Sequence, residues 1–225
     1  MSKRVAFFTI GESPRSDVVP AMRTLLGTQV QLDEFGALDA LDIQARAALA
    51  PRPGAHCFAT RLRDGSAITL DKKATEHRLA QLMHDADSAG YDLLVPLCTG
   101  TALPRLRTPL LEPQQVVDHV MAALAQHARS VGAVLPLATQ IDTFQLVQPL
   151  PCALRLAHAS PYERDPDAAA AAFTRAASML ADCDLIVMHC MGYTEAMRAQ
   201  VAQASGRPTL ASNQLVAQLL AQLLA

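Results

Sequence analysis

The chain alternates between short, continuous apolar runs and longer segments in which apolar residues recur at helical spacing. Continuous apolar runs are typical of parallel strands that are buried on both faces. Strands are predicted at residues 5–10, 30–35, 92–97, 131–137, 154–159, 184–189 and 208–211. Helices, the first capped by Asp17, are predicted at residues 17–26, 39–50, 72–89, 114–129, 140–147, 166–182, 195–204 and 213–224. This alternation predicts an α/β fold with mostly parallel sheets covered by helices.

One segment interrupts the alternation of strands and helices. Two short runs, residues 57–63 and 66–70, flank Asp64-Gly65, a dipeptide favoured in tight turns between antiparallel strands. The sequence therefore predicts a β-hairpin arm over about residues 56–70, as an insertion relative to the second half of the chain.

Two strand ends carry the same pattern of residues. The run DLLVxxCxG at 92–100 matches DLIVxxCxG at 184–192, an offset of 92 residues (190 − 98). The match could also be coincidence, because Asp followed by Leu, Ile and Val is common in buried strands. Coincidence accounts less well for the matched cysteine and glycine. We expect two pseudo-symmetric α/β lobes, one formed by residues 1–112 with 208–225 and the other by residues 113–207.

The ends of the two matched strands are candidates for an active site. Ligands of open α/β sheets bind at the carboxyl ends of the strands. Cys98 and Cys190 stand there, followed by small residues and a helix. Because backbone N–H groups in such a turn stabilise a thiolate or bind a carboxylate, we predict that these two cysteines are catalytic. The other three lack this context and are interpreted as structural: Cys57, Cys152 and Cys183.

Hydrogen-bond donors near the same strand ends are candidates for binding a substrate. Arg15 follows the first strand and offers a guanidinium suited to a carboxylate, the alternative being a solvated side chain or a pair with Asp17. Arg61 lies on the hairpin arm, where an ordinary surface arginine is the alternative. Helix capping is the alternative for the threonines after Cys98 and for Tyr193. The predicted substrate-binding residues are Ser13, Arg15, Arg61, Thr99, Gly100, Thr101, Gln140, Gly192 and Tyr193.

His189 precedes Cys190 and needs a separate interpretation. Successive side chains of a strand point to opposite faces, so the imidazole points away from the side of the Cys190 thiol. We therefore interpret His189 as a buried histidine with a hydrogen-bond partner rather than as a catalytic residue.

Composition narrows the class of protein. The 225 residues are 51% hydrophobic with a net charge of −2, and they contain no basic cluster or aromatic platform for nucleic acid. The sequence contains no apolar run long enough for a membrane span, so we expect a cytoplasmic protein. Its five cysteines are an odd number without C-x-x-C or zinc-ligand spacing. Free thiols, no metal and no disulfide are therefore expected, with a homodimer as the default assembly and the hairpin arm as its contact.

Several motifs together resemble the AroM family, within the aspartate/glutamate racemase-like superfamily. They are TIGESPR at 9–15, EFGALD at 34–39, TRLRDG at 60–65, CTG at 98–100, Pro136 with Gln140, and CMGY at 190–193. The resemblance implies two pseudo-symmetric α/β lobes with an active-site cleft between them and no cofactor. It also implies a relationship to racemases of amino acids and hydantoins, arylmalonate decarboxylase and maleate isomerase.

The residues after each cysteine depart from the racemase pattern. Racemases of free amino acids usually have Cys-Asn-Thr after the first strand and Cys-Thr-His after the second. Here the triplets are Cys98-Thr99-Gly100 and Cys190-Met191-Gly192. The resemblance therefore predicts the fold more closely than the substrate.

The leading hypothesis is a cofactor-independent racemase or epimerase. Two facing thiols suit proton removal and return at a carbon next to a carboxylate or cyclic amide, because one acts as thiolate base and the other as acid. The expected substrate is a small carboxylate or a hydantoin-like compound. Alternatives on the same fold are a decarboxylase, which needs one cysteine as proton donor, and a cis–trans isomerase with a nucleophilic cysteine. A cysteine hydrolase and a non-catalytic carboxylate-binding protein are the other classes.

Overall fold

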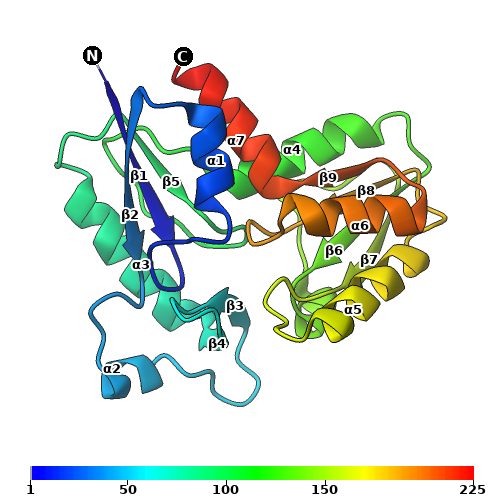
Figure 1. Cartoon of the computed structure of the whole chain (residues 1–225), viewed down its shortest axis with the longest axis horizontal. Helices are drawn as coiled ribbons and strands as arrows, with labels where there is room; N and C mark the ends of the chain where they lie inside the picture. Colours follow the sequence, from blue (N-terminus) through cyan, green and yellow to red (C-terminus); the bar gives the residue numbers. More distant parts are fainter. Residues whose placement is uncertain (1) are drawn as a thin grey trace. The chain divides into compact units, whose positions relative to one another are not determined.

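The computed structural model describes residues 2–225, a mixed α/β chain whose parallel sheets are flanked by helices (Figure 1). It divides into two compact units. One contains the residues up to Pro113 and Gln218–Ala225, and the other is Gln114–Ala217. Residues 208–217 therefore belong to the second unit rather than to the first, where the sequence placed them. The physical reason is that strand β9 (Thr209–Ala211) pairs with a strand of the second unit.

The first unit is built on a parallel sheet of three strands in the order β2-β1-β5. The central strand is β1 (Lys3–Thr9), and it is buried from Val5 onward. Its neighbours are β2 (Val30–Gly36) and β5 (Leu93–Pro96). The helices of this unit are α1 (Val19–Leu26), α2 (Ile43–Ala47) and α3 (Lys72–Ala86).

Two expected helices of this unit differ from the sequence interpretation. Val18, not Asp17, occupies the N-cap position of α1, because the Asp17 carboxylate binds Arg15 instead. The helix expected at 39–50 is reduced to the short α2, which Asp42 caps by accepting a hydrogen bond from Ala45 N–H.

The hairpin arm is confirmed. Strands β3 (Cys57–Arg61) and β4 (Ala67–Asp71) pair in antiparallel register, with Arg61 opposite Ala67. Gly65 lies in the turn between them at φ +87°, a conformation that favours glycine. Leu70 packs with Leu38 and Leu49 in a small core of its own, which attaches the arm to the segment after β2.

The second unit is built on a parallel sheet of four strands in the order β7-β6-β8-β9. The strands other than β9 are β6 (Ser130–Leu135), β7 (Ala153–His158) and β8 (Leu185–Met188). The helices are α4 (Pro113–Ala125), α5 (Pro166–Met179), α6 (Glu195–Ser205) and α7 (Ser212–Leu223), whose last turns belong to the first unit. In place of the helix expected at 140–147 there is a short 3-10 helix, η1 (Ala138–Thr143).

The internal repeat has a physical counterpart in the two sheets. The order β2-β1-β5 corresponds to β7-β6-β8, with β9 added at one edge. The repeated aspartates hold equivalent strand starts: Asp92 accepts a hydrogen bond from Arg4 N–H at 2.8 Å, and Asp184 accepts one from Arg129 N–H at 2.6 Å. The first residue of the repeated motif is therefore architectural, and each cysteine stands at the same place in its own sheet.

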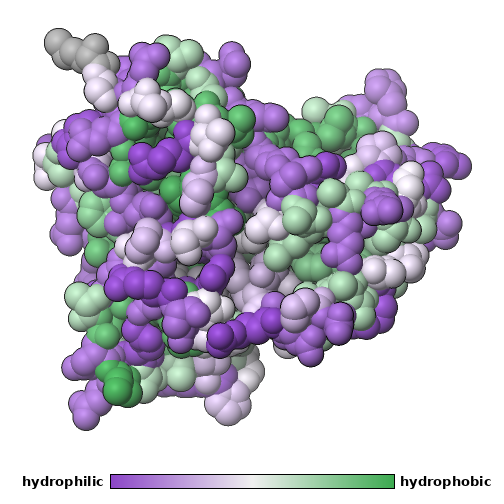
Figure 2. Space-filling model, in the orientation of Figure 1, coloured by the Kyte–Doolittle hydropathy of each residue, from purple (hydrophilic) through white to green (hydrophobic). Residues whose placement is uncertain are grey.

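Within residues 2–225, the longest apolar helices are too short or too polar to cross a bilayer. Hydrophilic and hydrophobic residues are interspersed over the face shown in Figure 2. Each unit also buries large apolar side chains in its interior, among them Phe7, Phe8 and Phe173.

Candidate active site

In the first unit, two loops leave the sheet at the same edge. Phe8 of β1 is in register with Pro96 of β5, and Leu97 N–H donates to the carbonyl oxygen of Phe8 at 2.6 Å. The loop that contains Ser13 and Arg15 therefore starts beside the loop that contains Cys98. This is the carboxyl edge at which ligands of such sheets bind.

Cys98 is a partly buried thiol at this edge. It packs against a core cluster that includes Ile10 and Phe58, and its S–H donates to the carbonyl oxygen of Thr99 at 3.3 Å. Gly100 follows at φ +87°, and Thr101 is buried. The turn thus places the Thr99 carbonyl oxygen next to the sulfur.

Glu76 of α3, which the sequence interpretation missed, holds the Cys98 loop, and Lys72 lies beside its carboxylate. Glu76 Oε1 accepts a hydrogen bond from Ala102 N–H at 2.7 Å, and Lys72 Nζ lies 3.8 Å from the same oxygen. The Lys72 ammonium also lies 5.5 Å from the centroid of the Phe58 ring. The spacing of Lys72 and Glu76 marks a helical ion pair, but only the fold brings that pair to the Cys98 loop.

Ser13 makes hydrogen bonds that hold its own loop in place. Its N–H and hydroxyl donate to the two carboxylate oxygens of Asp39 at 2.9 and 2.5 Å, and Gly36 N–H donates to the same carboxylate at 2.7 Å. The Arg63 guanidinium donates to the carbonyl oxygen of Ser13 at 2.9 and 2.6 Å. The structure therefore gives Ser13 a supporting role, whatever it contributes to a ligand.

Arg15 adopts the paired alternative rather than the solvated one. Its Nε and Nη2 donate to the two oxygens of Asp17 at 2.9 and 2.8 Å, its Nη1 donates to Thr9 Oγ1 at 3.0 Å, and only 3% of its side chain is exposed. Burial alone raises the pKa of Asp17, but the hydrogen bonds and charge of Arg15 outweigh burial and hold that pKa below its usual value. Arg15 is thus a buried structural cation.

Arg61 is more accessible than Arg15. Its Nη1 lies 4.0 Å from the Asp17 carboxylate, which Arg15 already neutralises, and 32% of its side chain is exposed. A guanidinium with one long ion pair retains donors that can face an anion. Of the two arginines predicted to bind substrate, Arg61 is therefore better placed to do so.

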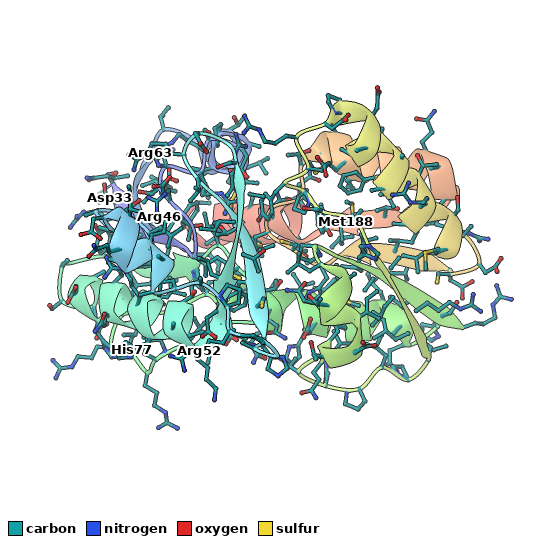
Figure 3. All side chains as sticks on the ribbon, turned by 90° about the horizontal axis from the view of Figure 1, so that it is seen from below. Asp33, Arg46, Arg52, Arg63, His77 and Met188 are labelled. Carbon is teal, nitrogen blue, oxygen red and sulfur yellow. The ribbon has the colours of Figure 1, made fainter. Side chains whose placement is uncertain are left out.

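The hairpin arm lies directly against the loop after β1. Glu12 N–H donates to the carbonyl oxygen of Arg61 at 3.3 Å, and a Cβ on Gly11 would collide with Thr60 Oγ1 and that same carbonyl. Glu12 also binds Arg46 of α2 at 2.5 Å and the N–H of Arg63 at 2.6 Å; Figure 3 labels both arginines. The motifs at 9–15, 34–39 and 60–65 thus converge into one hydrogen-bonded assembly.

Cys190 occupies the equivalent strand end in the second unit. It is partly buried and follows β8, whose last residue, Met188, is labelled in Figure 3. The N–H of Gly192 donates to Cys190 Sγ at 3.4 Å, which favours a thiolate. Because Val134 of β6 is in register with Met188, the loop after β6, which carries the partly buried Gln140 on η1, leaves the same edge.

Tyr193 packs inside the second unit behind the Cys190 turn. It is fully buried, its hydroxyl donates to the carbonyl oxygen of Ala159 at 2.9 Å, and its ring meets that of Phe173 edge to face. Burial raises the pKa of Tyr193 well above its usual value. A Cβ on Gly192 would collide with the hydroxyl of Tyr162. Tyr193 and Gly192 therefore shape the turn.

His189 has the buried, partnered environment expected from the sequence. Its Nε2 lies 2.6 Å from Oδ1 of Asp118 on α4. Asp118 was missed, although a lone acidic residue within the apolar pattern VVDHVM is a signal that deserved notice. All five cysteines are thiols rather than disulfides, and none of the residues in 2–225 forms a group of three or more potential metal ligands from His, Cys, Asp and Glu.

Comparisons with known proteins agree on family and fold. The family model described as AroM protein matches residues 5–224. Among curated protein sequences, none matches the chain closely enough to count as a relative. The comparison with solved structures, however, finds similar folds at low sequence identity.

Three of these structures represent different reactions. Glutamate racemase from Thermus thermophilus has a TM-score of 0.59 at 17% identity, covering 99% of this chain and 80% of its own. Unliganded arylmalonate decarboxylase has a TM-score of 0.53 at 13% identity, covering 97% and 92%. Maleate isomerase from Pseudomonas putida S16 has a TM-score of 0.52 at 13% identity, covering 98% and 92%. The likeness establishes the racemase-like fold.

Proposed function

The chain belongs to the AroM family, and we propose that it is a cofactor-independent enzyme that removes and returns a proton at a carbon next to a carboxylate or a cyclic amide carbonyl. Cys98 and Cys190 are the proposed proton-transferring groups. The observation that carries this proposal is their placement: each partly buried thiol follows a buried strand, at equivalent positions of two sheets with the same strand order.

Two thiols suit this reaction because it needs a base and an acid. A hydrogen on a carbon next to a carbonyl group is weakly acidic, so a thiolate must remove it while nearby donors stabilise the developing enolate. The second thiol then delivers a proton to the opposite face. The proposal requires both sulfurs to reach the same carbon, and their roles exchange for the opposite enantiomer.

Backbone and arginine donors provide the proposed binding groups for the substrate. The turn of Thr99, Gly100 and Thr101 directly follows Cys98, and its backbone N–H groups are proposed donors to the substrate; Gln140 comes from the loop that leaves the sheet edge at Cys190. Arg61 is the proposed partner for a substrate carboxylate because its guanidinium is partly exposed. We assign supporting roles to the remaining candidates, Ser13, Arg15, Gly192 and Tyr193, because their contacts lie within the protein.

The solved structures support this class of reaction without selecting one member of it. A racemase, a decarboxylase and an isomerase share the fold, and all three act on small molecules according to their names. A one-cysteine reaction such as decarboxylation is the second candidate. It is favoured by a difference between the two thiols, because Cys98 donates a hydrogen bond to a carbonyl oxygen whereas Cys190 accepts one from an N–H.

A proton NMR screen in deuterated water tests the proposal. Amino acids, hydantoins and small dicarboxylates are incubated with the protein, and the signal of the hydrogen next to the carbonyl is followed. We expect loss of this signal for at least one compound, with no loss for the double variant C98S/C190S and normal loss for the control C57S/C152S.

The same screen separates the alternatives. Loss of carbon dioxide with incorporation of one deuteron identifies a decarboxylase. Binding without exchange, detected as a rise in Tm with a screened compound, identifies a non-catalytic carboxylate-binding protein and contradicts the proposed activity.

A further inference from the structure

A buried pair of polar side chains, His189 and Asp118, stands beside Cys190, and the reaction proposed above does not use it. The side chains of His189 and Asp118 are 2% and 0% exposed, and His189 Nε2 lies 2.6 Å from Asp118 Oδ1. A buried carboxylate is unfavourable unless hydrogen bonds compensate it. Asp118 has two further donors, Val147 N–H at 2.9 Å and Gln114 Nε2 at 3.4 Å. Three segments of the second unit therefore satisfy this carboxylate.

The pair fixes the point at which the chain leaves β8. The N–H of His189 donates to the carbonyl oxygen of Val134 at 2.9 Å, and the imidazole also meets the Phe144 ring edge to face, with centroids 4.8 Å apart. The next residue turns at once, since Cys190 N–H donates to the carbonyl oxygen of Met188 at 3.0 Å. With ring and backbone of His189 both held, the direction of the Cys190 turn is held as well.

The shape of this turn decides the hydrogen bonding of the sulfur. Gly192 N–H points at Cys190 Sγ, at 3.4 Å, only while the turn keeps its conformation. Tyr193 anchors the far end of the turn through its buried hydroxyl, so His189 and Tyr193 hold it from both sides. A backbone N–H that donates to sulfur stabilises the thiolate relative to the thiol.

The first half of the chain has the opposite arrangement. Leu97 precedes Cys98 as His189 precedes Cys190, and it is a buried apolar residue. The S–H of Cys98 donates to the carbonyl oxygen of Thr99 at 3.3 Å, and an acceptor of this kind favours the protonated thiol. The repeat therefore places the two cysteines in equivalent positions, where Cys98 donates a hydrogen bond to a carbonyl oxygen and Cys190 accepts one from an N–H.

We propose that Asp118 and His189 are positioning residues that hold Cys190 in its thiolate-stabilising turn, so that Cys190 is the base of the resting enzyme and Cys98 carries the proton. The Cys190 thiolate takes the proton from the substrate carbon, and the Cys98 thiol gives its proton to the opposite face. Proton exchange with water then restores the starting state. The role of Cys190 as the catalytic base rests on the proposed function. The effect of His189 on the reactivity of the Cys190 thiol does not.

Alkylation of the full chain by iodoacetamide tests the inference without turnover. The rates at Cys190 and Cys98 are measured together by peptide mass spectrometry, so each protein carries its own reference. We expect the Cys190-to-Cys98 rate ratio to fall about tenfold in H189A, which corresponds to one pKa unit of thiolate stabilisation. The conservative variant H189Q keeps a donor for Asp118 and retains most of the ratio, and the exposed control H127A leaves it unchanged.

The direction of the change separates positioning from simple loosening. If His189 only held the fold together, its loss would expose the half-buried thiol and raise the alkylation rate of Cys190. An unchanged or raised ratio in H189A therefore overturns the inference. A lowered ratio in a protein that exchanges no substrate proton keeps the inference and rejects the proposed function.

Discussion

The guanidinium of Arg15 and the carboxylate of Asp17 form a buried two-point ion pair, at 2.9 and 2.8 Å. The exposed fractions of their side chains are 3% and 9%. The pair fixes the loop after β1, against which the hairpin arm packs. A residue that resembles a ligand-binding arginine in the sequence is thereby part of the framework of the site.

Replacing Arg15 should therefore cost stability rather than binding alone. Removing one partner of a buried pair leaves an uncompensated charge, so we expect R15Q to lower the free energy of unfolding of the first unit by about 3 kcal/mol. Calorimetry measures this as a lower Tm for one transition. The matched variant R61Q, which touches the same carboxylate from 4.0 Å, should change stability by less than about 1 kcal/mol. Equal losses in the two variants would contradict this assignment.

Arg61 should affect binding instead. For a screened substrate that carries a carboxylate, we expect R61Q to raise KM about tenfold, because a charge-assisted hydrogen bond is lost. Its effect on kcat should be small. Unchanged KM values in R61Q for every carboxylate substrate would place the anion-binding group elsewhere.

Gly11 should be intolerant of a side chain. A Cβ there would collide with Thr60 and with the backbone of Arg61, so G11A must displace the hairpin arm. We expect faster hydrogen exchange in β3 and β4 of this variant and earlier proteolytic cleavage near the turn at Gly65. T69A, on the exposed face of β4, is the control and should behave like the parent protein. Parent-like exchange in G11A would show that the arm packs differently.

Each of the two repeated aspartates, Asp92 and Asp184, should stabilise a strand of its own sheet only. D184N should speed hydrogen exchange in β6, and D92N should do so in β1, because each carboxylate holds the start of that strand. Hydrogen bonds from Arg129 lower the pKa of Asp184 from 3.8 to about 2. Because the folded-state pKa is depressed, the ionised carboxylate contributes stability above about pH 4 and loses it as the pH falls toward 2. If lowering the pH increases hydrogen exchange in β6 by the same factor in D184N as in the parent protein, this role of Asp184 is contradicted.

Glu76 should control the mobility of the Cys98 loop. E76Q weakens a charge-assisted hydrogen bond to Ala102 N–H, so we expect that amide to exchange about tenfold faster, the equivalent of about 1.4 kcal/mol. Hydrogen exchange followed by NMR reports the residue directly. An exchange rate at Ala102 that does not respond would mean that the loop is held by other contacts.

The strands, the hairpin and the two strand-end cysteines are predictable from sequence because they depend on local patterns. Continuous apolar runs define β1 and β8, and Asp64-Gly65 defines the turn of the arm. The hydrogen-bond and ion-pair partners of polar side chains are not predictable from local patterns. The sequence leaves open whether Arg15 faces solvent or pairs with Asp17, and only the folded chain shows that it is paired and buried.

Long-range pairs explain most of the remaining differences. Asp118 and His189 are 71 residues apart, and Glu76 and Ala102 are 26 apart, so their contacts exist only in the folded chain. Tyr193 follows the Cys190 turn in sequence and is a natural candidate for a ligand contact. The pairing of its hydroxyl with Ala159, 34 residues away, is what turns it inward.

The most direct test of the account is deuterium incorporation at the substrate carbon by the single variants C98S and C190S, using a compound identified in the screen. If both thiols transfer protons, each folded variant should lose at least about a hundredfold in racemisation rate. C190S should also lose exchange of the proton that the thiolate abstracts. Full deuterium exchange in both C98S and C190S would contradict the central claim.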